Sequence, residues 1–282
     1  MSEQARGQSL HIGVNKVDPA HYNGWEGPLQ ACEFDANDMQ ALAEGKGFTT
    51  SILLTKDATS EAVQAGISKA ADQLAEGDIF FLTYSGHGGQ VPDSNSDDDE
   101  DGKDETWVLY DRQLVDDELY ALFARFEPGV RIFMLSDSCH SGSVARDIFD
   151  AAVPHVVAHA MVDVPKPRTK DLPREVQSET YRANAAEYDR IQKECPSGET
   201  QDIGASLLLL SGCQDNQLSL DGDRNGLFTQ QLLSVWDGGA WAGGYAPFHK
   251  AIGAKMPPTQ SPNYFRVGAT SQAFESQTPF TI

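Results

Sequence analysis

The sequence predicts an α/β fold in which helices cover both faces of a mostly parallel central sheet. Five apolar runs of strand length are continuous rather than alternating, which is typical of strands that are covered on both faces. Segments with apolar residues at helical spacing lie between these runs, and such alternation of strands and helices favours parallel pairing. The predicted strands are 10–14, 51–55, 78–86, 131–139 and 206–213.

The predicted helices fill the gaps between these strands. Residues 28–44 carry apolar side chains at helical spacing, and Gly45 follows as a stop signal. Residues 59–74 begin with Thr-Ser-Glu and place six apolar residues on one face. Residues 116–126 and 226–236 are further candidate helices.

The segment 165–200 breaks this pattern. It carries seven Lys and Arg residues and no long apolar run, so we expect a surface excursion with one solvated helix near 175–194. The alternative is an exposed linker that is open to proteolysis. The predicted organisation is therefore a larger region at 1–164, a linker at 165–200 and a smaller region at 201–282, which together form one compact domain.

A net charge of −21 over 282 residues limits the expected partners. The 42 acidic residues outnumber 21 basic ones, so the chain should repel the phosphates of nucleic acids and anionic membranes. Hydrophobic residues make up 40%, which is enough for a buried core. The four cysteines form no C-x-x-C pair, and no signal peptide or membrane span is visible. We therefore expect a cytoplasmic protein.

Two of the predicted strands end in residues that can perform chemistry. One strand runs into His87-Gly88-Gly89, and another ends on Cys139. The carboxyl ends of parallel strands meet at one edge of a sheet, where ligands bind. An imidazole there can raise the thiolate fraction of a nearby thiol and later protonate a leaving amine. A lone Cys is more often a core residue, and we interpret Cys32, Cys195 and Cys213 in that way.

The residues around this pair resemble the two catalytic blocks of metacaspases and orthocaspases, which are caspase-like cysteine peptidases. The blocks are YSGHGG at 84–89 and DSCHSG at 137–142. His87 and Cys139 are 52 residues apart, near the spacing of roughly 50 in caspases. The resemblance implies the caspase-haemoglobinase fold with p20-like and p10-like regions, His87 and Cys139 as the catalytic dyad, and an oxyanion hole from the N–H groups of Gly88 and Cys139. The likeness extends to 31–39, 115–119, 210–215 and 225–229.

The position of Asp137 indicates which peptide bond is cut. Residues two apart on a strand share a face, so Asp137 can line the same pocket edge as Cys139. A carboxylate there attracts Lys or Arg and repels Asp. The resemblance implies Asp35 as the second carboxylate of this S1 pocket; the alternative is that Asp35 only decorates a helix. We expect cleavage after Arg or Lys, with Arg favoured by bidentate geometry.

An acidic segment, 93–105, suggests a calcium ion. It holds eight carboxylates in thirteen residues, and although a solvated loop is the common fate of such a run, hard oxygen ligands suit Ca²⁺. Residues 97–102 match only the first half of an EF-hand loop. The resemblance implies a different ligand set. The implied ligands are Asp104, Asp116, Asp117 and Asp147. The chain departs from the family pattern at two places: the stretch between Asp104 and Asp116 is shorter than usual, and Asp147 lies one residue later than the family's last ligand.

Three functions are compatible with these features. The first is a monomeric, calcium-stimulated cysteine endopeptidase that acts on proteins or peptides with a basic residue before the cut bond and can cut itself within 165–200. The second is a catalytically silent caspase-like module that binds partners, which the fold alone would allow. The third is an unrelated acyl-transfer hydrolase. The intact His-Cys pair argues against the second, and the paired carboxylates argue against the third.

Overall fold

The structure is a computed structural model that describes residues 4–94, 102–139, 168–195, 202–214 and 217–282. Its centre is a six-stranded sheet with the order β11-β9-β7-β3-β1-β2. All its pairings are parallel except that of β11 with β9. The strands are β1 Gly7–Gly13, β2 Thr49–Leu54, β3 Ile79–Ser85, β7 Arg131–Asp137, β9 Ser206–Ser211 and β11 Asn263–Gly268.

The five strands predicted from apolar runs all form, and their burial explains the runs. Every residue of β3 is buried, and β7 is buried at all positions except Arg131. Consecutive residues of β3 face opposite sides, because Phe80 belongs to one hydrophobic core and Phe81 to the other. A strand between two cores needs apolar side chains on both faces.

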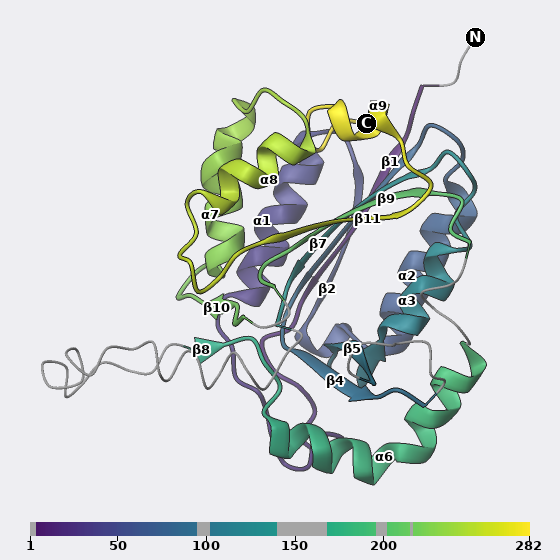
Figure 1. Cartoon of the computed structure of the whole chain (residues 1–282), viewed down its shortest axis with the longest axis vertical. Helices are drawn as coiled ribbons and strands as arrows, with labels where there is room; N and C mark the ends of the chain where they lie inside the picture. Colours follow the sequence, from purple (N-terminus) through teal and green to yellow (C-terminus); the bar gives the residue numbers. More distant parts are fainter. Residues whose placement is uncertain (1–3, 95–101, 140–167, 196–201, 215–216) are drawn as a thin grey trace, which may run out of the picture.

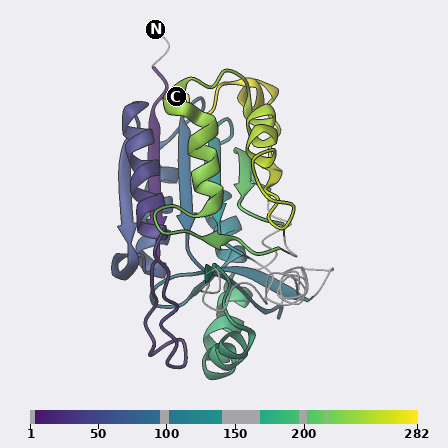
Figure 2. The same cartoon turned by 90° about the vertical axis from the view of Figure 1, so that its left-hand side faces the viewer.

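Helices cover both faces of this sheet, as Figures 1 and 2 show. Met39 of α1, Leu232 of α7 and Phe248 of α8 belong to one core. Val63 of α2 and Leu119 of α3 belong to the other. The four predicted helices therefore form, and the α/β prediction is confirmed. The helices are α1 Cys32–Gly45, α2 Ser60–Gln73, α3 Asp116–Phe123, α7 Leu227–Trp236, α8 Tyr245–Gly253 and α9 Gln272–Ser276.

Two smaller sheets lie beyond the carboxyl ends of the central strands. One is antiparallel and has the order β4-β5-β6, while the other pairs β8 with β10. None of these strands holds a long apolar run, so hydrophobic patterning alone did not predict them. Their bounds are β4 Gly88–Pro92, β5 Lys103–Val108, β6 Gln113–Val115, β8 Arg168–Thr169 and β10 Leu220–Asp221.

The polar segment contains the expected helix, α6, which spans Arg174–Glu194. Tyr188 and Ile191 pack against Val91 in a small cluster apart from the two main cores. The residues just before α6 differ from the expected exposed linker, because the Lys170 side chain is fully buried. This segment is therefore part of the molecule's interior where it crosses the ends of the central strands.

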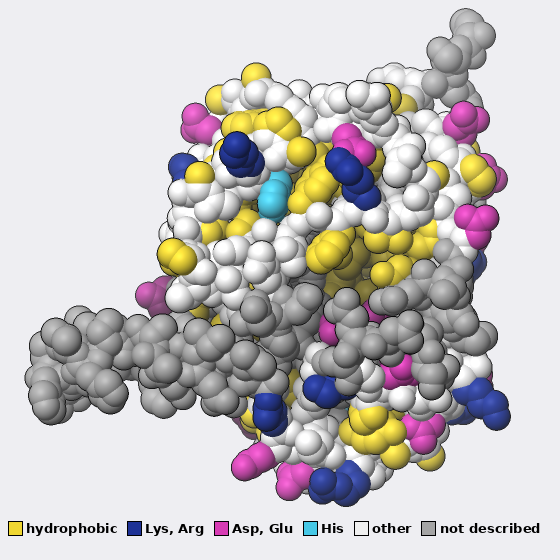
Figure 3. Space-filling model, viewed as in Figure 1, with side chains coloured by type: hydrophobic (Ala, Val, Ile, Leu, Met, Phe, Trp, Pro, Cys, Tyr) yellow, Lys and Arg dark blue, Asp and Glu magenta, His cyan; other side chains and the backbone are white. Residues whose placement is uncertain are grey.

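Charged side chains of both signs occur on the face of the molecule that includes β11. Figure 3 shows Lys and Arg side chains interspersed with Asp and Glu on the face that it displays. None of the helices in the described part of the chain is long and apolar enough to cross a membrane.

Candidate active site

His87 and Cys139 lie at the ends of two adjacent parallel strands. The register of β3 and β7 places Ser85 opposite Asp137, and each of the two candidate residues follows two positions later. Both side chains are buried. The backbones touch here, because a Cβ atom at Gly88 would collide with the carbonyl group of Cys139. Only glycine therefore fits after His87 at this distance from the neighbouring strand.

One ring nitrogen of His87 is held by the main chain. Its Nε2 lies 3.1 Å from the carbonyl oxygen of Gly27. A carbonyl can only accept, so Nε2 carries the proton and Nδ1 is the basic nitrogen. Within the described residues Nδ1 has no hydrogen-bond partner. The centroid of the His87 ring also lies 4.8 Å from that of the Trp25 ring. Burial lowers the pKa of His87 to about 4. The imidazole is thus neutral, fixed in orientation and able to accept a proton.

Cys139 is a buried thiol in this arrangement. The backbone N–H of Ser219 donates to its Sγ at 2.6 Å, and the side chain packs with Cys213 and Leu218. Burial raises the pKa of Cys139 well above its usual range, and the neighbouring Cys213 acts in the same direction. All four cysteines of the chain are free. The dyad is therefore uncharged, as a thiol and a neutral imidazole.

Asp35 and Asp137 hold the ammonium group of Lys170 between them. The Nζ atom lies 2.9 Å from Asp137 and 3.2 Å from Asp35, and it donates to Ser85 Oγ at 2.9 Å. An ammonium has three donors, so each finds an oxygen. Although burial alone lowers the pKa of Lys170, Asp137 and Asp35 raise it well above its usual range. The structure thus brings the two predicted S1 carboxylates together around a basic side chain.

The walls of this pocket fix the two carboxylates. Asp35 accepts from the backbone N–H of Gly226 at 3.0 Å, and Asp137 accepts from Thr229 Oγ1 at 3.2 Å and Ser219 Oγ at 2.5 Å. A side chain at Gly226 would collide with Asp137 and with the Lys170 ammonium, so a glycine is needed there. Burial, together with the charge of Asp137, raises the pKa of Asp35 to about 6. The pocket is preformed by residues from both predicted regions.

The main chain of Lys170 occupies the space in front of the dyad. Its carbonyl oxygen accepts from the N–H groups of Gly88 at 2.9 Å and Cys139 at 3.2 Å. These are the two groups that the family resemblance implies as the oxyanion hole. The Lys170 N–H donates to Ser219 O at 3.0 Å, and the Leu172 N–H donates to Gly88 O at 2.8 Å. Residues 168–172 thus run through the site as an extended peptide.

Three of the four implied calcium ligands lie within the described residues. Asp104 and Asp117 are buried, and both are close enough to Asp116 to affect it. Burial, with the charges of Glu105, Asp104 and Asp117, raises the pKa of Asp116 well above its usual range. Asp147 lies outside the described residues. Among the residues that are described, no group of three or more His, Cys, Asp or Glu is arranged to hold a metal ion.

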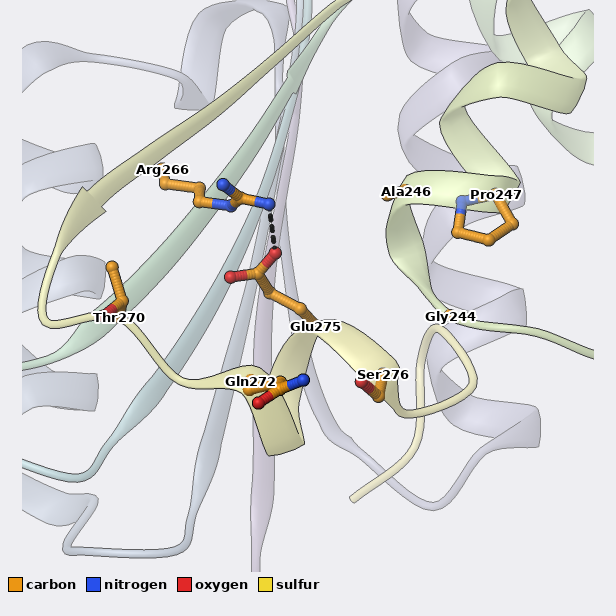
Figure 4. Close-up of a pocket in the computed structure, with 8 residues that line it drawn as sticks. All are labelled: Gly244, Ala246, Pro247, Arg266, Thr270, Gln272, Glu275 and Ser276. Atoms are coloured by element: carbon orange, nitrogen blue, oxygen red, sulfur yellow. Dashed lines mark ion pairs between the residues drawn. The ribbon is translucent and has the colours of Figure 1, made fainter.

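A second hollow lies away from the dyad, beside α8, α9 and β11 (Figure 4). Arg266 and Glu275 form an ion pair of 2.6 Å within it. The residues that line this hollow include neither His nor Cys. It therefore lacks the imidazole and the thiol of the candidate dyad, and the ends of β3 and β7 remain the candidate active site.

Several residues of the site were not apparent in the sequence. Ser85 and Gly226 contact the predicted carboxylates, and Gly27 orients His87. Asp221 begins a D-x-D-x-N-G string at 221–226, and a string of such residues before a helical segment is typical of a turn. Lys170 is one of seven basic residues in a polar segment, and nothing in the sequence distinguishes it from the other six.

Comparison with known proteins adds the family context. A family model described as the caspase domain matches residues 12–274. Metacaspase-1 of Mycosarcoma maydis is 29% identical over 256 residues, which cover 81% of this chain and 61% of that protein. Metacaspase-1A of Neurospora crassa is 37% identical over 154 residues, which cover 49% of this chain and 32% of that protein. The chain thus spans less than two thirds of the length of these relatives.

Two solved structures extend the comparison to the fold. The protein GSU0716 from Geobacter sulfurreducens is 50% identical, with a TM-score of 0.88 over 98% of both chains. Caspase-1 from Spodoptera frugiperda has a TM-score of 0.53 at 10% identity, covering 94% of this chain and 86% of its own, which shows a shared fold alone. The family model covers nearly all of the chain, and the relatives agree with it. The chain therefore belongs to the caspase domain family.

Proposed function

We propose that this protein is a cysteine endopeptidase that cuts peptide bonds after Lys or Arg. The observation that carries the proposal is the position of Lys170. Its ammonium lies between Asp35 and Asp137, while its carbonyl oxygen accepts from Gly88 and Cys139. A basic P1 residue, the residue whose carbonyl is attacked, would need this combination of a side-chain pocket and a polarised carbonyl.

The chemistry assigned to the site follows from its groups. Nδ1 of His87 takes the thiol proton of Cys139, and Sγ attacks the P1 carbonyl carbon to form a tetrahedral oxyanion. The N–H groups of Gly88 and Cys139 stabilise that charge. His87 then protonates the leaving amine as the C–N bond breaks, which leaves a thioester. Water hydrolyses the thioester and regenerates the thiol. Gly27 keeps the proton-carrying Nε2 turned away from the reaction.

The same contacts support a specific self-cleavage site. Among the basic residues of 165–200 that the structure describes, Lys170 is the one whose carbonyl lies on both N–H groups, so the bond to Asp171 is the bond that the enzyme would cut in its own chain. Intact-mass measurement tests this. We expect fragments 1–170 and 171–282 from the wild type and none from Cys139→Ala. A cut after another basic residue would contradict the assignment.

Calcium stimulation is a separate proposal with narrower support. Asp104, Asp116 and Asp117 lie close together where β5 meets α3, and a divalent cation would relieve their mutual repulsion. The described carboxylates do not by themselves form a metal site, so a further ligand such as Asp147 is needed. Titration with calcium should raise peptidase activity, and chelator should reverse the effect. If the activity is the same in chelator, the proposal of calcium stimulation is contradicted, whereas the peptidase proposal is unaffected.

A panel of peptides that differ only at P1 tests the peptidase proposal. We expect hydrolysis of Lys and Arg peptides, no hydrolysis of the Asp peptide, and no activity in Cys139→Ala. Faster cleavage of the Asp peptide would overturn the specificity. Absence of all cleavage, with Cys139 inert to a peptide-based alkylating agent, would favour the silent binding module. The monomeric state and the cytoplasmic location stay predictions from the sequence.

A further inference from the structure

A second basic side chain of the same segment is held by a second set of carboxylates. Arg168 precedes Lys170 by two residues, and its Nε lies 2.9 Å from Asp221 Oδ2. Its Nη2 donates to the carbonyl oxygen of Gly222 at 3.1 Å and lies 3.3 Å from Asp223. The guanidinium thus meets three acceptors, two of which are charged.

The carboxylate of Asp221 is held in place by backbone hydrogen bonds. Its side chain is fully buried, and its two oxygens accept from the backbone N–H groups of Gln30 at 2.9 Å and Ala31 at 3.0 Å. Residues 30 and 31 immediately precede α1, the helix that carries Asp35. These bonds hold the carboxylate in place independently of Arg168. A carboxylate that is already oriented in this way can bind a guanidinium without first being ordered.

The main chain determines which residue of a peptide reaches this carboxylate. Arg168 and Thr169 form β8, which pairs antiparallel with Asp221 and Leu220 of β10. The Lys170 N–H continues the pattern by donating to Ser219 O. Side chains two apart on an extended strand share a face. When Lys170 fills the S1 pocket, the side chain two residues earlier is therefore directed at Asp221.

We propose that Asp221 and Asp223, with the carbonyl group of Gly222, form a second specificity site that selects Arg at P3, two residues before the cut residue. This inference rests on the proposed peptidase function and adds a second determinant to it. Arg is preferred over Lys, because Nε and Nη2 donate together to acceptors that a single ammonium cannot reach in the same way. Substrates would then carry the pattern Arg-x-Lys or Arg-x-Arg.

Peptides of the form X-Thr-Lys, in which X is Arg, Gln or Glu, test the proposal on the wild-type protein. Each peptide must displace residues 168–170, whether or not the bond after Lys170 has been cut, but that cost is common to all and cancels in ratios of kcat/KM. We expect Arg to exceed Gln by about five- to tenfold, since a partly exposed ion pair contributes modestly. Glu should fall below Gln. Equal values for Arg and Gln would overturn the proposal.

Variants separate a specificity site from a structural ion pair. Asp223 is fully exposed, so replacing it should not endanger the fold. We expect Asp223→Lys to lower the Arg/Gln ratio by about two- to threefold and Asp221→Asn to bring it near one. Asp72→Asn removes one negative charge from the distant helix α2, as Asp221→Asn removes one from the site, and it should leave the ratio unchanged. A ratio that none of these variants alters would overturn the assignment. If no Lys-ending peptide is cut at all, the proposed peptidase function fails instead.

Discussion

Two groups of carboxylates near the ends of the same sheet have opposite surroundings. In the proposed S1 pocket, Asp35 and Asp137 face the Lys170 ammonium and a full set of hydrogen-bond donors. Around Asp116, the charges that act on it are those of other carboxylates. A cluster of acidic residues is therefore not enough to identify the site for a basic side chain in this protein. The first group is arranged to hold a basic side chain, whereas the second has a surplus of negative charge that a proton or a cation would relieve.

The largest expected effect is the loss of the pocket charge in Asp137→Asn. An isosteric amide keeps the pocket's size but removes the charge next to Nζ. Loss of one partner of a buried charge pair costs about 2–5 kcal/mol, so kcat/KM for Lys peptides should fall by at least thirtyfold. The measurement is steady-state hydrolysis, with Asp72→Asn as the control. A change of less than threefold would show that Asp137 does not bind the P1 side chain.

Removing the internal ligand should destabilise the uncut chain. In a Cys139→Ala background, Lys170→Gln leaves two buried carboxylates without their ammonium, at a cost of about 3 kcal/mol. Lys170→Arg keeps the charge and should lose much less. Urea unfolding of the three proteins measures the difference. If Lys170→Gln were as stable as its parent, the ammonium would not stabilise the pocket.

The pocket should also respond to pH. Burial raises the pKa of Asp35 to about 6 even with the Lys170 ammonium beside it, so in a pocket without an ammonium this group becomes charged at a higher pH. Binding of a basic P1 side chain should therefore strengthen as the pH rises from 6 to 8, seen as a falling KM for Lys peptides. In Asp35→Asn this step should disappear. A KM that is flat over this range in the wild type would contradict the assignment.

The smallest expected effect is a gain in the stability of the folded chain. Asp116→Asn removes a carboxylate whose charged form is disfavoured by burial and by the neighbouring carboxylates, so it should stabilise the chain by about 1 kcal/mol in chelator. The same change should reduce any stabilisation by added calcium. Thermal unfolding with and without calcium measures both. Destabilisation in chelator would mean that Asp116 makes a favourable contact rather than a repulsive one.

The parts of the fold that the sequence predicted are those with local signals. Continuous apolar runs reflect burial on both faces, as in β3 and β7, and the ends of these strands indicated His87 and Cys139. The antiparallel strands β4–β6 and β11 carry no such run and were not predicted. Asp137 followed from its spacing to Cys139, whereas Asp35 was implied only by the family resemblance.

The occupant of the pocket could not be predicted, because its signals are long-range. Lys170 contacts Asp35 across 135 residues of sequence, and Arg168 contacts Asp221 across 53. Composition indicated an exposed segment, since Lys and Arg are usually solvated. The structure reverses that expectation for Lys170, because a preformed pair of carboxylates compensates the cost of burying its charge.

Covalent labelling of Cys139 tests directly whether Cys139 is the nucleophile and whether Asp137 selects a basic P1 residue. Two peptide acyloxymethyl ketones that differ only in a final Lys or Asp are incubated with the wild type and with Asp137→Asn, and the labelled residue is identified by mass spectrometry. We expect rapid labelling of Cys139 by the Lys reagent, little by the Asp reagent, and a large loss of this preference in Asp137→Asn. Equal labelling by both reagents, or labelling of Cys32, Cys195 or Cys213 in place of Cys139, would contradict it.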